Sequence, residues 1–232
     1  LDNTDYWVII ADYSQLFEGG NYLNNKKVVV YGDSTIARLG GLSYMDIVET
    51  TCNCKVTNRA VAGSAMNRGA NNGVSLITAS DDLTDYDFIF LAYGTNEWQM
   101  GLSRDDIRND LLSLLSAVYS KNAKIEVIFV NPYYSYHVYG TNPANYNTKG
   151  MTIEVVNGII QNELDIRNIP YIDFYHRSGC SAQNYTALLE DSGGGIYVHA
   201  NNSFKKELAA IVAKGGNCRN FDKHIEEMLF SY

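Results

Sequence analysis

Short runs of β-branched and aromatic residues alternate along this chain with segments of helical periodicity, and this alternation constrains the fold more than any other feature. Most of the runs are almost continuously apolar, whereas a strand with one exposed face alternates apolar and polar residues. Continuous runs are typical of strands that are buried on both faces, as in a parallel sheet. The predicted strands are residues 27–31, 54–60, 88–92, 125–130 and 169–174.

Apolar residues between the runs recur three and four positions apart, which is the spacing of a helix with one buried face. We expect Ser103, Thr152 and Ser203 to cap three such helices, with Asp106 completing a capping box at the first. Strands that alternate with helices predict a three-layer α/β sandwich, in which helices cover both faces of a five-stranded parallel sheet. The three helical stripes are residues 107–118, 153–164 and 204–212.

The length and composition suit one globular domain. The chain has 232 residues, of which 46% are hydrophobic, and this is enough to bury a sizeable core. No linker rich in proline or serine divides the sequence. We therefore expect a lead-in segment at residues 1–25 and one domain at residues 26–232. The first residue is Leu1 rather than methionine, which indicates a processed protein or a piece of a longer one.

The charge of the chain argues against polyanionic partners. The formal net charge is −8 and the sequence pI is near 4.9. Such a surface repels the phosphates of nucleic acids and of anionic membranes, so a neutral substrate is favoured and nucleic acid is not expected as a partner. The longest apolar run near the start, residues 6–11, is too short to span a bilayer. The sequence does not indicate an oligomeric state.

Four cysteines allow three disulfide pairings, and the sequence does not choose among them. Cys52 and Cys54 have no second Cys/His pair at zinc-finger spacing, so a structural metal site is not expected. A disulfide between Cys180 and Cys218 and a set of four free thiols both remain open.

Candidate functional residues follow the predicted strands. In parallel α/β folds the active site lies beyond the carboxyl ends of the strands, so these segments carry the chemistry. In chain order the segments are Gly32-Asp33-Ser34-Thr35, Gly63-Ser64, Gly94-Thr95-Asn96-Glu97, an aromatic loop at residues 131–140, and His199 just before the last helical stripe.

These residue types supply the parts of an acyl-transfer site, which needs a nucleophile, a base and donors for the developing oxyanion. Ser34 stands where we expect the first strand to give way to a helix, whose dipole favours negative charge. Gly63 can present its N–H without an obstructing side chain, Asn96 offers side-chain N–H groups, and His199 is the candidate base. Singly, each has a structural interpretation as a turn, a helix cap or a satisfied histidine. Their placement at successive strand ends favours a site.

Four segments resemble the sequence blocks of the SGNH (GDSL-like) hydrolases, and they occur in the same order. The resemblance extends from about residue 26 to residue 214 and implies a flavodoxin-like sandwich with five parallel strands. It also implies that Ser34 is the nucleophile, that His199 is its base, and that the Ser34 N–H, the Gly63 N–H and the Asn96 side chain form the oxyanion hole. No metal or cofactor is implied. The segments are 28–34 (VVVYGDS), 58–64 (NRAVAGS), 93–97 (YGTNE) and 198–201 (VHAN).

Two positions depart from the family pattern. The family commonly has an aspartate three residues before the histidine to orient the imidazole, and here that position is Ile196. Asp191 lies upstream of the insertion 192–195 and is the candidate orienting acid, although a solvated loop charge is an equally good interpretation. A backbone carbonyl that orients His199 is a further alternative. Glu97 replaces the usual aspartate of the third block and keeps its charge.

Tyrosine is abundant, with 18 residues, and its flat apolar ring and hydroxyl suit the binding of sugars or protein surfaces. The remaining histidines His176 and His224 are interpreted as structural. The predicted substrate rim is Tyr133, Tyr134, Tyr136 and His137.

The leading functional prediction is a serine esterase that hydrolyses a small ester, with O-acetyl groups on a carbohydrate as the expected substrate. The expected location is extracellular, cell-surface or virion-associated. The alternative is a non-catalytic glycan- or surface-binding module on a degenerate esterase scaffold, because position 196 lacks the acid. A third interpretation, a flavodoxin-like cofactor domain in which residues 32–35 cradle a phosphate, explains neither Asn96 nor His199.

Overall fold

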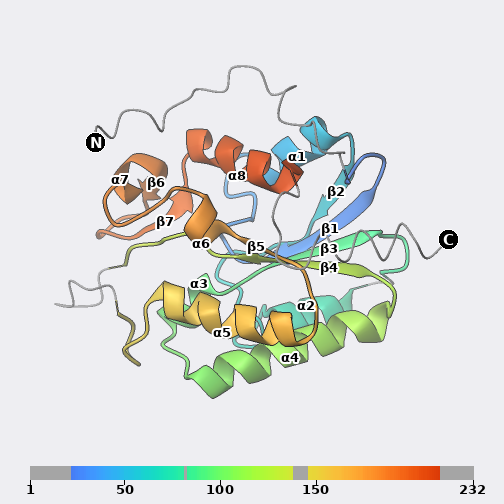
Figure 1. The fold of residues 1–232 in the computed structure, drawn as a ribbon, viewed down its shortest axis with the longest axis horizontal. Coiled ribbons are helices and arrows are strands. Elements are labelled where there is room, and N and C mark those ends of the chain that lie inside the picture. Colours follow the sequence, from blue (N-terminus) through green and yellow to red (C-terminus); the bar gives the residue numbers. More distant parts are fainter. Residues whose placement is uncertain (1–21, 81–82, 138–145, 215–232) are drawn as a thin grey trace.

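The predicted strands form one parallel sheet. The computed structural model describes residues 22–80, 83–137 and 146–214, with helices in layers above and below the sheet (Figure 1). The strands are β1 (Lys27–Gly32), β2 (Lys55–Asn58), β3 (Phe88–Ala92), β4 (Glu126–Asn131) and β5 (Tyr171–Asp173). Their order in the sheet is β2-β1-β3-β4-β5, which is flavodoxin-like. The predicted five-stranded α/β sandwich is therefore confirmed, with every strand end within two residues of its expected position.

The direction in which strands are added reverses between β1 and β3. Strand β1 pairs with β2 on one side and with β3 on the other, so that Val30 lies opposite both Asn58 and Phe90. In open parallel sheets, the loops on the two sides of such a point diverge and leave a crevice at the carboxyl ends of the strands. The crevice lies between the loop after β1 and the loop after β3, and the loop after β2 is next to it, since β2 neighbours β1. Ligands bind at this crevice in this class of fold.

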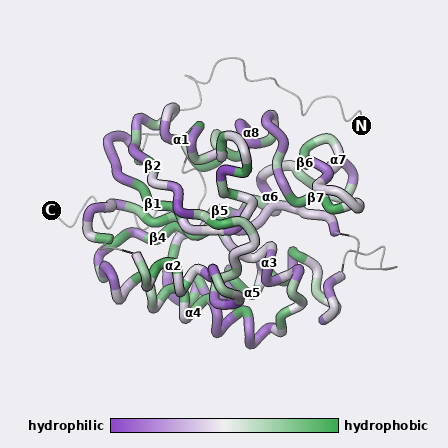
Figure 2. The backbone as a smooth tube through the Cα atoms, turned by 180° about the vertical axis from the view of Figure 1, so that it is seen from behind, coloured by the Kyte–Doolittle hydropathy of each residue, from purple (hydrophilic) through white to green (hydrophobic). Residues whose placement is uncertain are grey.

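Helices cover both faces of the sheet. Those on one face are α1 (Tyr44–Cys52) and α8 (Asn202–Lys214), and those on the other are α2 (Gly73–Ala79), α4 (Arg104–Lys121) and α5 (Ile153–Ile166) (Figure 1). Val28 and Val30 pack under the first pair, whereas Val29 and Tyr31 pack under the second set. Because both layers are buried, β1 is apolar at every one of these positions. Figure 2 shows green stretches along the strands and green alternating with purple along α4.

Two of the three predicted helix caps are confirmed. Ser103 and Asp106 form the capping box of α4, and the Thr152 side chain accepts a hydrogen bond from Val155 N at the start of α5. The prediction of Ser203 as the cap of α8 is wrong. The helix begins at Asn202, so Ser203 already lies inside it, and Asn201 Oδ1 accepts from Phe204 N at 2.9 Å instead.

Smaller elements gather at the carboxyl end of the sheet (Figure 1). Two of these elements form a β-hairpin that the sequence patterns did not indicate, because its turn consists of one serine and three glycines and resembles an insertion. The hairpin places His199 on a strand rather than in a loop. The elements are α3 (Thr95–Gln99), α6 (Phe174–Arg177), α7 (Tyr185–Leu188) and the antiparallel strands β6 (Leu189–Asp191) and β7 (Tyr197–Ala200).

Within the described ranges, no helix combines the length and the apolarity needed to cross a bilayer. The three cysteines of those ranges, Cys52, Cys54 and Cys180, form no disulfide with one another. The disulfide between Cys180 and Cys218, one of the two alternatives left open by the sequence, involves Cys218, which lies outside the described residues.

Candidate active site

The turn after β1 carries Ser34. A side chain at Gly32 would lie 2.5 Å from Ile36 Cγ2 and 2.7 Å from the Ala92 carbonyl oxygen, so only glycine fits where β1 meets β3. Ser34 is half-buried in a hydrogen-bonded turn. The expectation that a helix begins here is wrong: Asp33 O accepts from Ile36 N, but the next helix, α1, starts only at residue 44. A helix dipole therefore does not act on Ser34.

The turn is held by the carboxyl group of Asp33, which is fully buried. Asp33 Oδ1 accepts from Thr35 N at 2.8 Å and from Thr35 Oγ1 at 2.6 Å, while Asp33 N donates to Ala92 O at 3.1 Å. Burial raises the pKa of Asp33 to about 6, against the lowering effect of the Thr35 hydrogen bonds. The residue before the candidate nucleophile therefore fixes the backbone on which Ser34 stands.

Gly63 and Asn96 lie in loops that are joined by hydrogen bonds. Val61 N donates to Gly32 O at 3.0 Å, and Asn96 Nδ2 donates to Ser64 O at 2.7 Å. Gly63 has a φ of 75°, which favours glycine, and the space beside its Cα is open. An amide nitrogen carries two hydrogens, so Asn96 keeps one N–H after binding Ser64. The structure thus brings the second and third predicted segments together beside the Gly32 end of β1.

Glu97 joins the same two loops through hydrogen bonds to their backbones. Its side chain is fully buried, and Oε2 accepts from Gly94 N at 2.8 Å while Oε1 accepts from Met66 N. Burial raises the pKa of Glu97 to about 7, and these backbone hydrogen bonds oppose the shift. The glutamate that departs from the family pattern therefore links the start of α3 to the segment after Gly63.

His199 lies on β7, half-buried, with its ring nitrogen Nδ1 at 2.9 Å from Ser192 Oγ. Burial lowers the pKa of His199, while Glu190, which is opposite in the hairpin, raises it and Lys205 lowers it. Asp191 does not reach the ring. Its Oδ1 instead accepts from Gly193 N at 2.8 Å, so the carboxylate closes the glycine turn.

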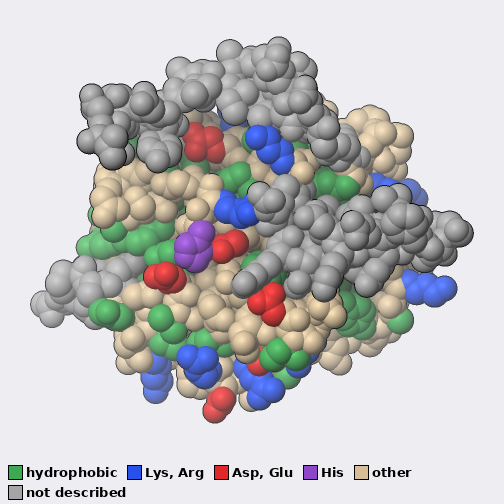
Figure 3. Space-filling model, viewed as in Figure 1, with side chains coloured by type: hydrophobic (Ala, Val, Ile, Leu, Met, Phe, Trp, Pro, Cys, Tyr) green, Lys and Arg blue, Asp and Glu red, His purple; other side chains and the backbone are tan. Residues whose placement is uncertain are grey.

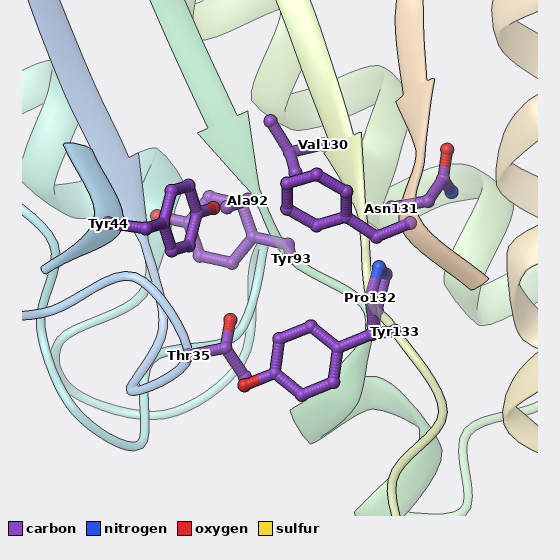
Figure 4. Close-up of a pocket in the computed structure, with 9 residues that line it drawn as sticks. Thr35, Tyr44, Ala92, Tyr93, Val130, Asn131, Pro132 and Tyr133 are labelled. Carbon is purple, nitrogen blue, oxygen red and sulfur yellow. The ribbon is translucent and has the colours of Figure 1, made fainter. Parts of the chain in front are cut away.

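Ser34 follows β1, and His199 lies on β7, which stands beside the carboxyl end of the sheet (Figure 1). No hydrogen bond joins the two side chains in the described part of the chain. Tyr133 connects their surroundings: its hydroxyl donates to Val198 O at 2.9 Å, next to His199. Tyr133 and Thr35 also line one small cavity of about 10 Å³, room for roughly one water molecule. In Figure 4 the Tyr133 ring extends from the loop after β4 toward Thr35.

Tyrosines form a cluster beside the hairpin. The Tyr136 ring stacks on Tyr185 with centroids 4.8 Å apart, and Tyr185 meets Tyr197 edge-on at 5.0 Å. The backbones of Tyr136 and Tyr197 exchange hydrogen bonds of 2.9 and 2.8 Å. Tyr197 and His199 are half-buried while Val198 between them is buried, so both side chains lie on one face of β7. We call Tyr134, Tyr136, Tyr185 and Tyr197 the tyrosine cluster.

The residues of the predicted substrate rim differ in burial. Tyr134, Tyr136 and His137 are half-buried, but Tyr133 is fully buried and its hydroxyl is bonded inside, so it is a core residue rather than a rim residue. Sequence reasoning missed Tyr185 and Tyr197. The signal for Tyr197 was its position two residues before His199, which on a strand puts the two side chains on the same face.

The other histidines lie apart from this arrangement. His176 is exposed in α6, with Nδ1 at 2.7 Å from Asp173 Oδ2 and Nε2 at 3.7 Å from Glu154 Oε1. His224 lies outside the described residues. In the portion of the chain that the structure describes, no group of histidine, cysteine and acidic residues is arranged to hold a metal ion.

A parallel sandwich with a serine turn after β1 and N–H donors after β2 and β3 defines the class of the SGNH-type hydrolases. The chain belongs to the GDSL-like lipase/acylhydrolase family, whose model matches residues 30–204. Membership of this family makes the chain a hydrolase that acts on esters.

Solved structures agree with this fold. A Lactobacillus plantarum protein is 19% identical to this chain, with a TM-score of 0.67. The match covers 82% of this chain and 96% of the other chain. The lipase/acylhydrolase from Enterococcus faecalis is 18% identical with a TM-score of 0.62, covering 84% and 98%. The aryl esterase of M. smegmatis is 12% identical with a TM-score of 0.57, covering 82% and 97%. No match was found among curated proteins.

Proposed function

We propose that the protein is a serine esterase in which Ser34 and His199 hydrolyse a small ester, with O-acetyl groups on a carbohydrate as the substrate. The observation that carries the proposal is the meeting of three loops at the end of β1. Val61 N bonds to Gly32 O at 3.0 Å and Asn96 Nδ2 to Ser64 O at 2.7 Å, which puts two donor loops beside the turn of Ser34. Donors that are already fixed are what an oxyanion requires.

The chemistry follows from the residues present. Neutral His199 takes the proton of Ser34, whose oxygen attacks the acyl carbon, and the developing oxyanion binds the N–H groups of Ser34, Gly63 and Asn96. The imidazolium then gives its proton to the leaving alcohol, and a water repeats the sequence to release the acid. Burial, which lowers the pKa of His199, favours the unprotonated imidazole, which is the form that can accept a proton. Catalytic hydrogen bonds that are long in a free enzyme tighten with substrate, as we expect for Ser34 and His199.

The tyrosine cluster supports a carbohydrate substrate. Its rings lie on the same face of the hairpin as His199 and are half-buried, so each retains accessible surface. Tyrosine combines a flat apolar ring with a hydroxyl, and a sugar presents C–H faces and hydroxyls in the same way. On the face seen in Figure 3, Lys and Arg side chains are dispersed rather than gathered, and the net charge is −8, which favours a neutral ligand. A glycan substrate also fits an extracellular, cell-surface or virion-associated location.

The test is hydrolysis of p-nitrophenyl acetate by the wild type and by Ser34→Ala. We expect the wild type to be active and kcat/KM of the variant to fall by at least roughly 10³-fold, because the nucleophile is lost. A serine-directed fluorophosphonate should label Ser34 in the wild type, and release of acetate from acetylated glycans tests the substrate class. Turnover that survives in Ser34→Ala would refute the assignment.

One observation favours the second candidate, a non-catalytic glycan-binding module. The structure shows no hydrogen bond between Ser34 and His199, and the ring partner is a serine rather than a carboxylate. Binding of a glycan by a protein that neither reacts with the fluorophosphonate nor hydrolyses the ester would select this candidate over the esterase.

A further inference from the structure

The residue that touches the imidazole of His199 is Ser192. Its Oγ lies 2.9 Å from Nδ1, and its backbone N–H donates to Ile196 O at 2.8 Å, which closes the hairpin turn. We propose that Ser192 is the positioning residue of the esterase: its hydroxyl holds the His199 ring in the place where the family commonly uses a carboxylate. The proposal rests on the proposed function of Ser34 and His199.

The protonation chemistry gives this hydrogen bond its direction. To take a proton from Ser34, the neutral ring needs a free lone pair on Nε2, so its own hydrogen must be on Nδ1. Ser192 Oγ, at 2.9 Å, then accepts that hydrogen and selects this tautomer. Once Nε2 has taken the proton, both ring nitrogens carry hydrogens and Ser192 remains an acceptor. The contact is therefore retained through proton transfer, and no rearrangement of the hairpin is needed.

The two acidic neighbours act differently from Ser192. Asp191 Oδ1 is engaged by Gly193 N at 2.8 Å, so its carboxylate belongs to the turn. Glu190 pairs with His199 across the hairpin, is exposed, and makes no hydrogen bond to the ring within the described residues. It raises the pKa of His199 as a nearby charge and so favours the imidazolium that forms during catalysis. The hydroxyl of Ser192, which orients the ring, and the carboxylate of Glu190, which acts on the ring from a distance, together replace the hydrogen-bonded aspartate of the family pattern.

Substitution of Ser192 tests the proposal with p-nitrophenyl acetate as substrate. We expect Ser192→Ala to lower kcat/KM about tenfold, since one hydrogen bond is lost, and Ser192→Thr to restore most of the activity, since the hydroxyl returns. Ser192→Asp should move the acidic limb of the pH profile of kcat/KM to higher pH, because a bonded carboxylate favours the charged ring. Ser116 is an exposed serine of α4. The variant Ser116→Ala is the matched control and should leave kcat/KM unchanged.

A spectroscopic measurement separates orientation from folding. The ¹⁵N shifts of the His199 ring should report the Nδ1–H tautomer in the wild type and a changed tautomer mixture in Ser192→Ala, with equal thermal stability of the two. An Nε2–H tautomer in the wild type, or unchanged kcat/KM and pH limb in Ser192→Ala, would overturn the role of Ser192 while an active, labelled wild type keeps the esterase. A larger loss in Asp191→Ala than in Ser192→Ala would also overturn it. A wild type that is inactive and unlabelled overturns both.

Discussion

The two halves of the site are built differently. The half that we propose as the oxyanion hole, called the oxyanion half, consists of the Ser34 turn, the Gly63 loop and Asn96. It stands on buried strand ends and is joined by hydrogen bonds between loops. The base half is the β6–β7 hairpin with His199, where residues 190–194 are exposed and one hydrogen bond, to Ser192, holds the ring. The fold itself therefore fixes the electrostatic part of the site, whereas a local turn fixes the base.

This difference has a physical consequence. Donors that are fixed before the reaction stabilise the oxyanion without reorganisation, so they belong on the best-ordered elements. Exposed segments with few buried contacts open locally at lower free energy, and the hairpin around Ser192 is such a segment. The orienting group of the base can therefore change from aspartate to serine without disturbance of Asn96 or Gly63.

After loss of the proposed nucleophile itself, the largest expected effect on turnover comes from breaking the oxyanion half. Asn96→Ala removes both the donor to the oxyanion and the 2.7 Å bond to Ser64 O. We expect kcat for p-nitrophenyl acetate to fall roughly 10²- to 10³-fold, because an oxyanion-hole donor contributes this much, with a loss of only about 1 kcal/mol in the free energy of unfolding. Steady-state kinetics and urea unfolding check the two parts. A fall in kcat smaller than that of Ser192→Ala would reverse the comparison between the halves.

The elements of the oxyanion half could be predicted from the sequence, because they follow from short-range rules. Apolar runs predict the strands, parallel strands put their ends at one edge, and the segments with Ser34, Gly63 and Asn96 follow those ends. The prediction of a helix at Ser34 is wrong, because the end of a strand and the spacing of apolar residues do not show whether a helix or a single turn follows. Asp33 binds Thr35 and ends the local pattern after one turn.

For the base half, the sequence indicates the candidate base, His199, but not the residues that surround it. The partner of His199 depends on the register of a hairpin whose pairing shifts between Glu190 and Asp191, and no periodicity encodes that shift. Charge makes Asp191 one candidate for the orienting group, beside a backbone carbonyl, yet the turn uses its carboxylate and leaves Ser192 at the ring. The contact of Tyr185 with Tyr197 likewise depends on how α7 packs on the hairpin, which is tertiary information.

A second effect, on stability rather than on turnover, distinguishes the halves by pH. Burial raises the pKa of Asp33 from 3.8 to about 6 and that of Glu97 from 4.5 to about 7. Between these values the native protein binds protons that the unfolded chain has released, so these groups make the free energy of unfolding fall as pH rises through this window. Taken together, the two shifts correspond to a change on the order of 6 kcal/mol in the free energy of unfolding across the window. Urea unfolding at a series of pH values measures it.

The variants Asp33→Asn and Glu97→Gln isolate the contribution of these two carboxyl groups from that of the other titrating groups. Glu97→Gln is expected to be less stable than the wild type, since Glu97 accepts backbone hydrogen bonds on both carboxylate oxygens and an amide can accept on only one. Asp33→Asn keeps an oxygen that can accept from Thr35, because both hydrogen bonds of Asp33 are made by Oδ1. The free energy of unfolding of both variants should fall less steeply between pH 4 and pH 7. A slope equal to that of the wild type in both variants would contradict the assignment of buried, proton-binding carboxyls to the oxyanion half.

The smallest effect belongs to the base half and concerns substrate choice. Tyr185 stacks on Tyr136 at 4.8 Å and meets Tyr197 at 5.0 Å, so its ring is central to the tyrosine cluster. If the cluster binds the sugar, Tyr185→Ala should raise KM for an acetylated oligosaccharide about fivefold, a cost of about 1 kcal/mol that is typical of an aromatic contact, and raise KM for p-nitrophenyl acetate less. Tyr185→Phe keeps the ring and should retain most of the affinity.

Tyr119→Ala provides the matched comparison, since Tyr119 is 38% exposed on α4, across the sheet from α1 and α8. It should change KM for neither substrate. An equal loss on both substrates in Tyr185→Ala would mean that the ring only supports the hairpin and the His199 ring upon it. In the proposed mechanism the oxyanion half binds the acyl group that the two substrates share, so a rise in KM that is selective for the oligosaccharide would assign recognition of the sugar to the tyrosine cluster beside the base half.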